Sequence, residues 1–115
     1  MLPKDGVSIF ASLSARVGSI QDNRLGGWVS YRASKAALNQ IIKTASIEIA
    51  RSYPESICVA LHPGTVKSAL TEKYLNTHDY VLPEIAAKNL MNVLTGLTPE
   101  NSGGFFDYLG RPIPW

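Results

Sequence analysis

Apolar stretches of two kinds alternate along the chain, and this alternation constrains its fold most strongly. Residues 7–13 and 57–62 are short, carry β-branched side chains and are bounded by turn residues, so each is predicted to be a strand. Between them, from about residue 30 to 52, apolar side chains recur at helical spacing, at Leu38, Ile41, Ile42, Ala45 and Ile49.

The second half of the chain continues the alternation. A short helix is expected at 68–75, and a longer one begins near Pro83. The longer helix has its apolar stripe at Ile85, Ala86, Leu90, Val93, Leu94 and Leu97. A last strand is expected at 105–109. This order of strands and helices predicts an α/β fold whose parallel strands are joined by crossover helices.

The first predicted strand has apolar side chains on both faces, which is typical of a strand buried inside a parallel sheet. No strand precedes it in this sequence. We therefore expect residues 1–115 to form one partial domain, the C-terminal half of a doubly wound, Rossmann-like sheet without its N-terminal dinucleotide-binding half. An uncovered edge strand is a template for pairing, so the chain alone is expected to self-associate, as a homo-oligomer or as an aggregate.

Composition excludes several classes of function. The net charge of +2, from 11 basic and 9 acidic residues, is too small to indicate a nucleic-acid partner. A single cysteine excludes an intrachain disulfide framework and a cysteine-rich zinc site, and no metal site is expected. No apolar run approaches the roughly 18 residues of a membrane span. The first residues do not resemble a signal peptide, so a soluble, cytoplasmic chain is expected.

Tyr31 and Lys35 are four residues apart at the start of the long predicted helix, which places both side chains on one face. A lysine ammonium close to a phenol favours the phenolate form, and such a tyrosine can donate or accept a proton near neutral pH. On spacing alone, a surface lysine beside a packed tyrosine is the preferred interpretation.

The surrounding residues resemble a known family. Residues 31–38, Tyr-Arg-Ala-Ser-Lys-Ala-Ala-Leu, resemble the active-site helix of the short-chain dehydrogenases/reductases. Residues 61–66, Leu-His-Pro-Gly-Thr-Val, resemble the Pro-Gly segment after the family's next strand, and residues 12–14 resemble the strand end that delivers the catalytic serine. Segments 14–20, 26–28 and 113–115 look most like the branch of C-factor and sniffer-like carbonyl reductases.

The resemblance implies a role for each matching residue. Tyr31 would be the general acid in carbonyl reduction, and Lys35 would bind the nicotinamide ribose. Trp28 would wall the substrate pocket. The cofactor would be NAD or NADP, and the substrate a small carbonyl compound or alcohol. The remaining cofactor-binding residues that the resemblance implies are Pro63, Gly64, Thr65, Val66 and, near the phosphates, Ser68.

The catalytic serine departs from the family pattern. Relatives carry a serine pair that ends three residues before the glycine of this loop, which here is Gly18. Counting back places Ala15 at the usual catalytic position and Ser14 one residue earlier. A shift of one residue turns a strand side chain to the other face. Ser14 is therefore the preferred catalytic candidate only if the strand end bulges or twists, Ser19 is a second candidate, and either serine could simply be a turn residue.

The sequence also lacks a glycine-rich turn of the Gly-x-x-x-Gly-x-Gly kind that would bind a pyrophosphate. Three hypotheses therefore stay open. The full-length product is an NAD(P)-dependent oxidoreductase, or the chain is a truncated, catalytically silent fragment that acts by association, or it is a signalling protein of the C-factor kind. Two further residues are less informative: His62 either titrates near the nicotinamide or is structural, and Cys58 is expected in the core.

Overall fold

In the computed structural model, which describes residues 2, 3, 5–66 and 80–115, three parallel strands form one sheet. The strands are β1 (Ser8–Leu13), β2 (Ser56–His62) and β3 (Phe105–Asp107), in the order β1-β2-β3. The helices α1 (Val29–Ala50) and α2 (Pro83–Thr95) and the short 3-10 helices η1 (Arg16–Gly18) and η3 (Pro99–Asn101) connect them. The predicted α/β order is confirmed in the described part, and the helix expected at 68–75 lies outside it.

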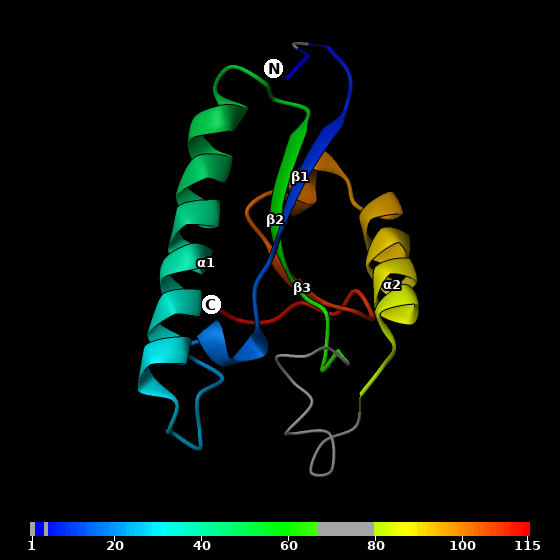
Figure 1. Cartoon of the computed structure of the whole chain (residues 1–115). Helices are drawn as coiled ribbons and strands as arrows, with labels where there is room; N and C mark the ends of the chain where they lie inside the picture. Colours follow the sequence, from blue (N-terminus) through cyan, green and yellow to red (C-terminus); the bar gives the residue numbers. More distant parts are fainter. Residues whose placement is uncertain (1, 4, 67–79) are drawn as a thin grey trace.

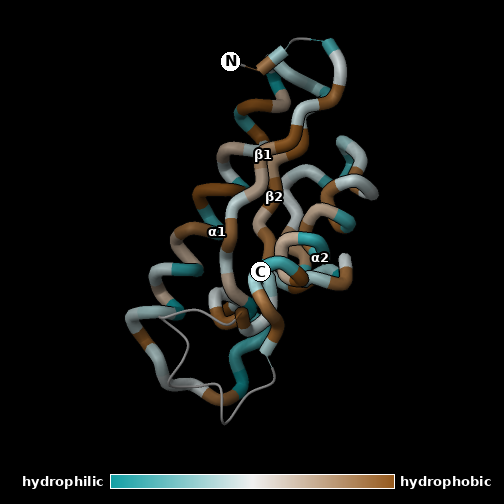
Figure 2. The backbone as a smooth tube through the Cα atoms, turned by 45° about the vertical axis from the view of Figure 1, so that its right-hand side comes forward, coloured by the Kyte–Doolittle hydropathy of each residue, from teal (hydrophilic) through white to brown (hydrophobic). Residues whose placement is uncertain are grey.

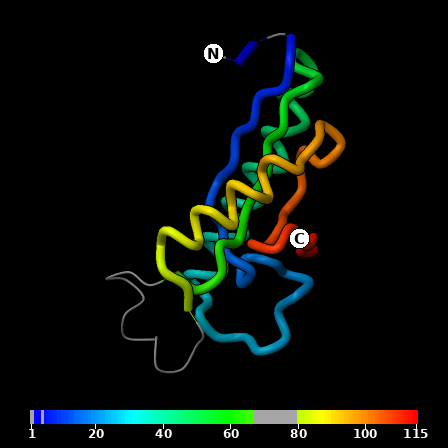
Figure 3. The backbone as a smooth tube through the Cα atoms, turned by 90° about the vertical axis from the view of Figure 1, so that its right-hand side faces the viewer, coloured from blue at the N-terminus to red at the C-terminus, as the bar shows by residue number. Residues whose placement is uncertain are grey.

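The two long helices lie on opposite faces of the sheet (Figures 1 and 3). β2 is the buried central strand, and its side chains alternate between two cores. Cys58 and Ala60 pack with Ile42 of α1, whereas Val59 and Leu61 pack on the side of α2. Burying both faces of β2 explains why its sequence is almost continuously apolar.

Each helix buries a narrower stripe than the sequence predicts. On α1, Ile42 is buried, but Ile41 is 63% exposed, because consecutive residues point about 100° apart around a helix. On α2, Ala86 is buried and Leu90 packs against the sheet, whereas Ile85 is 50% exposed. The expectation for Ile41 and Ile85 is therefore wrong. Hydrophobic residues recur on α1 as separate bands (Figure 2).

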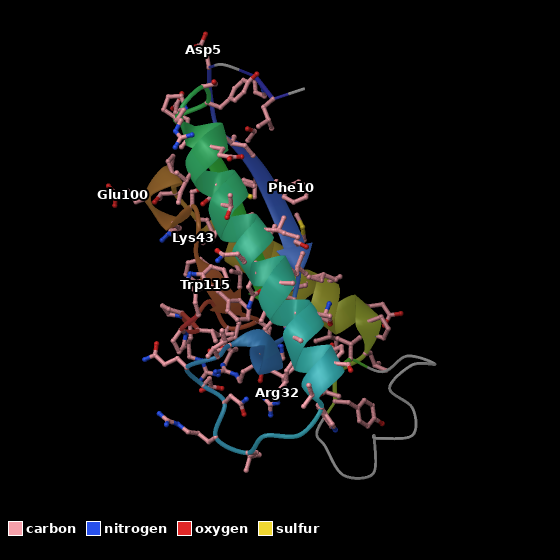
Figure 4. All side chains as sticks on the ribbon, turned by 90° about the vertical axis from the view of Figure 1, so that its left-hand side faces the viewer. Asp5, Phe10, Arg32, Lys43, Glu100 and Trp115 are labelled. Atoms are coloured by element: carbon pink, nitrogen blue, oxygen red, sulfur yellow. The ribbon has the colours of Figure 1, made fainter. Side chains whose placement is uncertain are left out.

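β1 is an edge strand, paired only with β2 among the described residues. Its expected burial on both faces is wrong, because none of the described residues covers its outer side. Ile9 is 42% exposed, Phe10 57% and Leu13 56%. Phe10 points away from the body of the sheet (Figure 4).

The segment after β3 is packed. β3 ends at Asp107, two residues earlier than expected. Ile113 is buried, and the Trp115 ring stacks on Phe105 with 5.3 Å between ring centroids. Among the described residues, no helix combines the length and the apolar character needed to cross a membrane.

Candidate active site

One end of the molecule gathers the segments that the sequence singles out. The carboxyl ends of β1 and β2, η1 and the first turn of α1 meet there (Figure 1). This follows from the parallel sheet, since the loops after parallel strands leave from the same edge.

The structure brings Tyr31 and Lys35 together, as their spacing predicts. The Lys35 Nζ atom lies 5.8 Å from the centroid of the Tyr31 ring and donates to the Leu13 carbonyl oxygen at 3.4 Å. The Tyr31 side chain is 47% exposed. The lysine therefore lies between the end of β1 and a tyrosine that a ligand can reach.

Ser14 is buried against α1. Its backbone N–H donates to the Leu61 carbonyl at 2.7 Å, and its Oγ donates to Asn39 Oδ1 at 2.6 Å. Asn39 follows Lys35 by one helical turn and was missed in the sequence, although the same i, i+4 spacing could have identified it. In this structure the hydroxyl proton of Ser14 is therefore donated to a side chain of α1.

Ser19 and Ala15, the other positions considered for the serine, are also buried. The Ser19 Oγ donates to the Pro114 carbonyl and accepts from the backbone N–H of Asp22 at 3.1 Å. Ser19 therefore fastens the loop after η1 to the C-terminal tail.

The Pro63–Val66 turn follows β2 directly. Gly64 has φ +80°, and a β-carbon there would lie 3.1 Å from the Tyr108 ring, so a larger residue would be strained. The Thr65 carbonyl accepts from the Val81 N–H at 2.9 Å. Pro63, Gly64 and Thr65 border an open pocket of about 80 Å³, which is also lined by Tyr80, Val81 and Tyr108.

Of two further predicted residues, the structure places one. Trp28 is the N-cap of α1, three residues before Tyr31, with a left-handed φ of 51° and a side chain that is 57% exposed. Ser68 lies outside the described residues.

An ionic cluster, which the sequence did not indicate, supports this end of the sheet. Asp107 is fully buried and accepts from Arg111 Nε at 2.8 Å and Arg16 Nη2 at 3.3 Å. Burial alone would raise the pKa of Asp107, but hydrogen bonds from the backbone N–H groups of Arg111 and Leu109 and from the Arg111 guanidinium outweigh it, so the pKa is lowered.

His62 adjoins this cluster, and its pKa is lowered by burial and by the Arg16 charge, against an opposing effect of Asp107. Cys58 is a core residue, as predicted, and burial raises the pKa of its thiol. No three His, Cys, Asp or Glu side chains are grouped to hold a metal ion in the described part of the chain.

Known proteins resemble the chain in sequence. No protein-family model matches it. It is 38% identical over 107 residues to the C-signal of Myxococcus xanthus, covering 91% of this chain and 60% of that protein. It is 38% identical to 1-hydroxy-2-glutathionyl-2-methyl-3-butene dehydrogenase of Rhodococcus sp. strain AD45, covering 90% of this chain and 45% of that protein. The chain thus spans about half the length of the curated relatives it matches.

Solved structures resemble it in fold. The carbonyl reductase Sniffer of D. melanogaster is 30% identical with a TM-score of 0.82, covering 94% of this chain and 41% of that one. An NADPH-bound carbonyl reductase from chicken fatty liver is 33% identical with a TM-score of 0.76, covering 94% of this chain and 43% of that one. The parallel sheet with a helix on each face is therefore a Rossmann-like arrangement found in these reductases.

The residues present fit one end of a nicotinamide dinucleotide. The Lys35 ammonium, beside an exposed phenol, offers hydrogen-bond donors suited to ribose hydroxyls. The backbone of the Pro63–Val66 turn borders a pocket, where a ligand can approach it. The sequence offers no glycine-rich turn for the pyrophosphate. The described residues therefore fit the nicotinamide end, and what the sequence lacks is the glycine-rich turn for the pyrophosphate.

Proposed function

Because this chain matches short-chain dehydrogenases/reductases in sequence and in fold, we propose that it carries the proton-transfer half of an NAD(P)-dependent oxidoreductase. The full-length protein would move a hydride between nicotinamide and the carbon of a small carbonyl compound or alcohol, in the cytoplasm. The contact between Lys35 and an accessible Tyr31 carries this proposal.

The chemistry assigns one task to each residue. Nicotinamide, when bound, supplies or accepts the hydride. In reduction the Tyr31 hydroxyl gives its proton to the substrate oxygen, and in oxidation the phenolate takes it back. The Lys35 ammonium stabilises the phenolate and binds the ribose hydroxyls. The negative charge that develops at the substrate oxygen is thus neutralised by the Tyr31 proton, and the charge left on the phenolate is stabilised by Lys35, both side chains of α1.

Other residues complete the proposed site. Backbone groups of the Pro63–Val66 turn would hold the nicotinamide, Ser68 would lie near the phosphates, and Trp28 would border the substrate. Ser14 is preferred over Ser19 as the hydroxyl that polarises the carbonyl, because Ser14 follows directly after Leu13, whose carbonyl Lys35 contacts, whereas Ser19 is bound to the tail at Pro114. To act in this way the Ser14 hydroxyl would have to exchange its hydrogen bond to Asn39 for one to the substrate. The pyrophosphate would be bound by an N-terminal half, so residues 1–115 would be one part of a larger domain.

A second candidate function is association without catalysis, either as a silent fragment or as a signal. The uncovered edge of β1 and the 38% identity to a C-signal favour it. DNA sequence upstream of Met1 discriminates between the two: an open frame encoding a glycine-rich strand-turn-helix supports the enzyme, and an in-frame stop codon supports the fragment.

The decisive experiment titrates NADPH and NADH into two proteins, the 115-residue chain and the full-length gene product. The chain alone should bind neither at micromolar concentration, since that needs about 8 kcal/mol and the phosphate-binding turn is missing. The full-length protein should bind one of them and reduce aromatic and aliphatic aldehydes. Tyr31→Phe should abolish turnover and leave affinity within about threefold, because the ring remains and only the proton donor is lost.

Three results would count against the proposal: a full-length protein that neither binds nor oxidises NADPH or NADH, normal turnover by Tyr31→Phe, or saturable micromolar binding by the chain alone. Normal turnover by Tyr31→Phe would end the proton-donor assignment whatever the other variants show.

A further inference from the structure

His62 lies at the junction of the two turns that frame the candidate site. It is the last residue of β2 and directly precedes Pro63. Its Nδ1 atom accepts a hydrogen bond of 3.2 Å from the backbone N–H of Arg16, the first residue of η1. Arg16 lies two residues after Ser14, just beyond the end of β1. The His62 side chain therefore links the carboxyl end of β2 to the turn that follows β1.

Only the neutral imidazole can make this hydrogen bond. An imidazolium carries a hydrogen on both ring nitrogens, so it would meet the Arg16 N–H donor to donor. With Nδ1 accepting, the single ring hydrogen of the neutral form is on Nε2. The ring is half-buried, and the burial and the Arg16 charge that lower its pKa below 6.5 favour the neutral form at pH 7.

Charged groups approach His62 from several elements. Arg16 belongs to η1, and its guanidinium pairs with Asp107 at 3.3 Å and with Asp22 at 3.8 Å. Asp107 belongs to β3, where it is the register partner of His62, and it also binds Arg111 of the tail. The Tyr108 ring lies on the remaining side, with 6.4 Å between ring centroids. A proton on His62 would therefore place a second positive charge beside Arg16.

The helix η1 connects this hydrogen bond to the candidate catalytic pair. Gly18, at the end of η1, packs directly on Lys35. If His62 were protonated, the Arg16 N–H would lose its acceptor at the start of η1. An unsatisfied donor is unfavourable, so the turn would move until this N–H is hydrogen-bonded again. Displacement of a site by about 1 Å is enough to lower turnover roughly 100-fold.

We propose that neutral His62 is a positioning residue that fixes the β1–η1 turn to the Pro63–Val66 turn and thereby holds Lys35 and Tyr31 in place for proton transfer. The proposal rests on the proposed function of that pair. It assigns His62 no contact with the substrate. It makes the activity depend on a proton that takes no part in the reaction.

The pH dependence of kcat/KM in the full-length gene product tests this. The wild type should lose activity as the pH falls through one midpoint below 6.5. His62→Asn supplies an acceptor near the Nδ1 position that does not titrate, so its profile should be flat from about pH 7 to 5, with activity at pH 8 within about threefold of wild type. His62→Leu, which has no acceptor, should lose about tenfold or more at pH 8.

A second pair of variants tests the direction of the electrostatic effect. Arg16→Gln removes the guanidinium but keeps the backbone N–H, so the midpoint should move to higher pH. Arg24→Gln, in the exposed loop that follows η1, is the matched control and should leave the midpoint unchanged. A merely structural role for His62 would move neither midpoint.

NMR of the same proteins separates this inference from the proposed function. The Arg16 amide resonance should titrate with the midpoint of His62 in the wild type and should not titrate in His62→Asn. If the protein has no turnover, the proposed function fails and the amide titration alone decides whether His62 holds η1. A static Arg16 resonance, or an unchanged midpoint in His62→Asn, overturns the inference.

Discussion

Gly18 lies directly against Lys35. A β-carbon added to Gly18 would stand 2.8 Å from the Lys35 β-carbon and 2.9 Å from its carbonyl carbon. The second of these atoms is backbone and cannot rotate away. η1 therefore reaches α1 at the level of the candidate catalytic lysine only because residue 18 has no side chain.

Gly18→Ala is accordingly expected to destabilise the chain by about 1–3 kcal/mol through overpacking. Gly96→Ala is the matched control, because Gly96 has φ −91° and its nearest neighbour would be 3.6 Å from the new carbon. That change should be neutral or stabilising by up to about 1 kcal/mol. Urea unfolding at equal protein concentration measures both, and equal midpoints would show that η1 is not packed tightly on α1.

Lys35→Ala in the full-length gene product should impair two properties at once. It removes a donor for the ribose, so the Kd for the cofactor should rise about tenfold, and it removes the charge beside Tyr31, so kcat should fall about 100-fold or more. Lys43→Ala, two turns further along α1 and exposed, should change neither. Cofactor fluorescence and steady-state kinetics give the two numbers, and a loss of affinity without a loss of kcat would remove Lys35 from the proton-transfer step.

The serine question is settled by three variants measured together. Ser14→Ala should lower turnover about 100-fold, the cost of losing one donor to a developing oxyanion. Ser19→Ala should leave turnover within about threefold but lower stability by about 1 kcal/mol, because it breaks the link to Pro114. Ala15→Ser should raise turnover if position 15 faces the substrate. A neutral Ser14→Ala with a faster Ala15→Ser would transfer the role from Ser14 to position 15.

Asp107 is expected to control stability at acid pH. Its pKa is lowered in the folded state, so the stability it contributes is present above its ordinary pKa near 3.8 and is lost as the pH falls through the folded value. Asp107→Asn should cost roughly 3 kcal/mol at pH 7, since two guanidinium groups lose their charged partner.

Below pH 3.8 the wild type should lose further stability as Asp107 takes up a proton. Asp107→Asn has no carboxyl group at this position, so its stability should fall less over the same pH range. His62 contributes separately: its lowered pKa means that stability begins to fall below pH 6.5. Thermal unfolding between pH 7 and 3 resolves the two steps. Identical pH profiles for the wild type and Asp107→Asn would refute the assignment of the acid step.

The order of the elements and the proximity of Tyr31 and Lys35 could be predicted because both depend on local spacing. Helical periodicity placed α1, and the i, i+4 rule placed Lys35 beside Tyr31. The exposure of Phe10 could not be predicted in the same way, because an apolar strand has the same pattern whether or not a neighbour covers it.

The ionic cluster around Asp107 could not be predicted from the sequence for a different reason. Arg16 and Asp107 are separated by 91 positions, and nothing in their local sequence marks them as partners. His62 was recognised only as a histidine at a strand end, because its acceptor role depends on a backbone N–H from another turn. Apart from Asn39, the contacts that were not predicted depend on tertiary packing and not on spacing.

The open edge of β1 leads to a final prediction. Phe10 is 57% exposed and Ile9 42%, on a strand whose outer hydrogen-bonding groups have no neighbouring strand among the described residues. The isolated chain should therefore self-associate at roughly micromolar concentrations, as uncovered apolar edges do. Phe10→Lys should suppress this self-association, because a charge on an edge strand opposes pairing.

Leu25→Lys is the matched control. It adds the same charge at a loop residue that is 94% exposed, and it should not suppress self-association. Light scattering decides: a monodisperse wild-type species of 12.5 kDa, or equal suppression by both lysines, would show that β1 is not the associating edge.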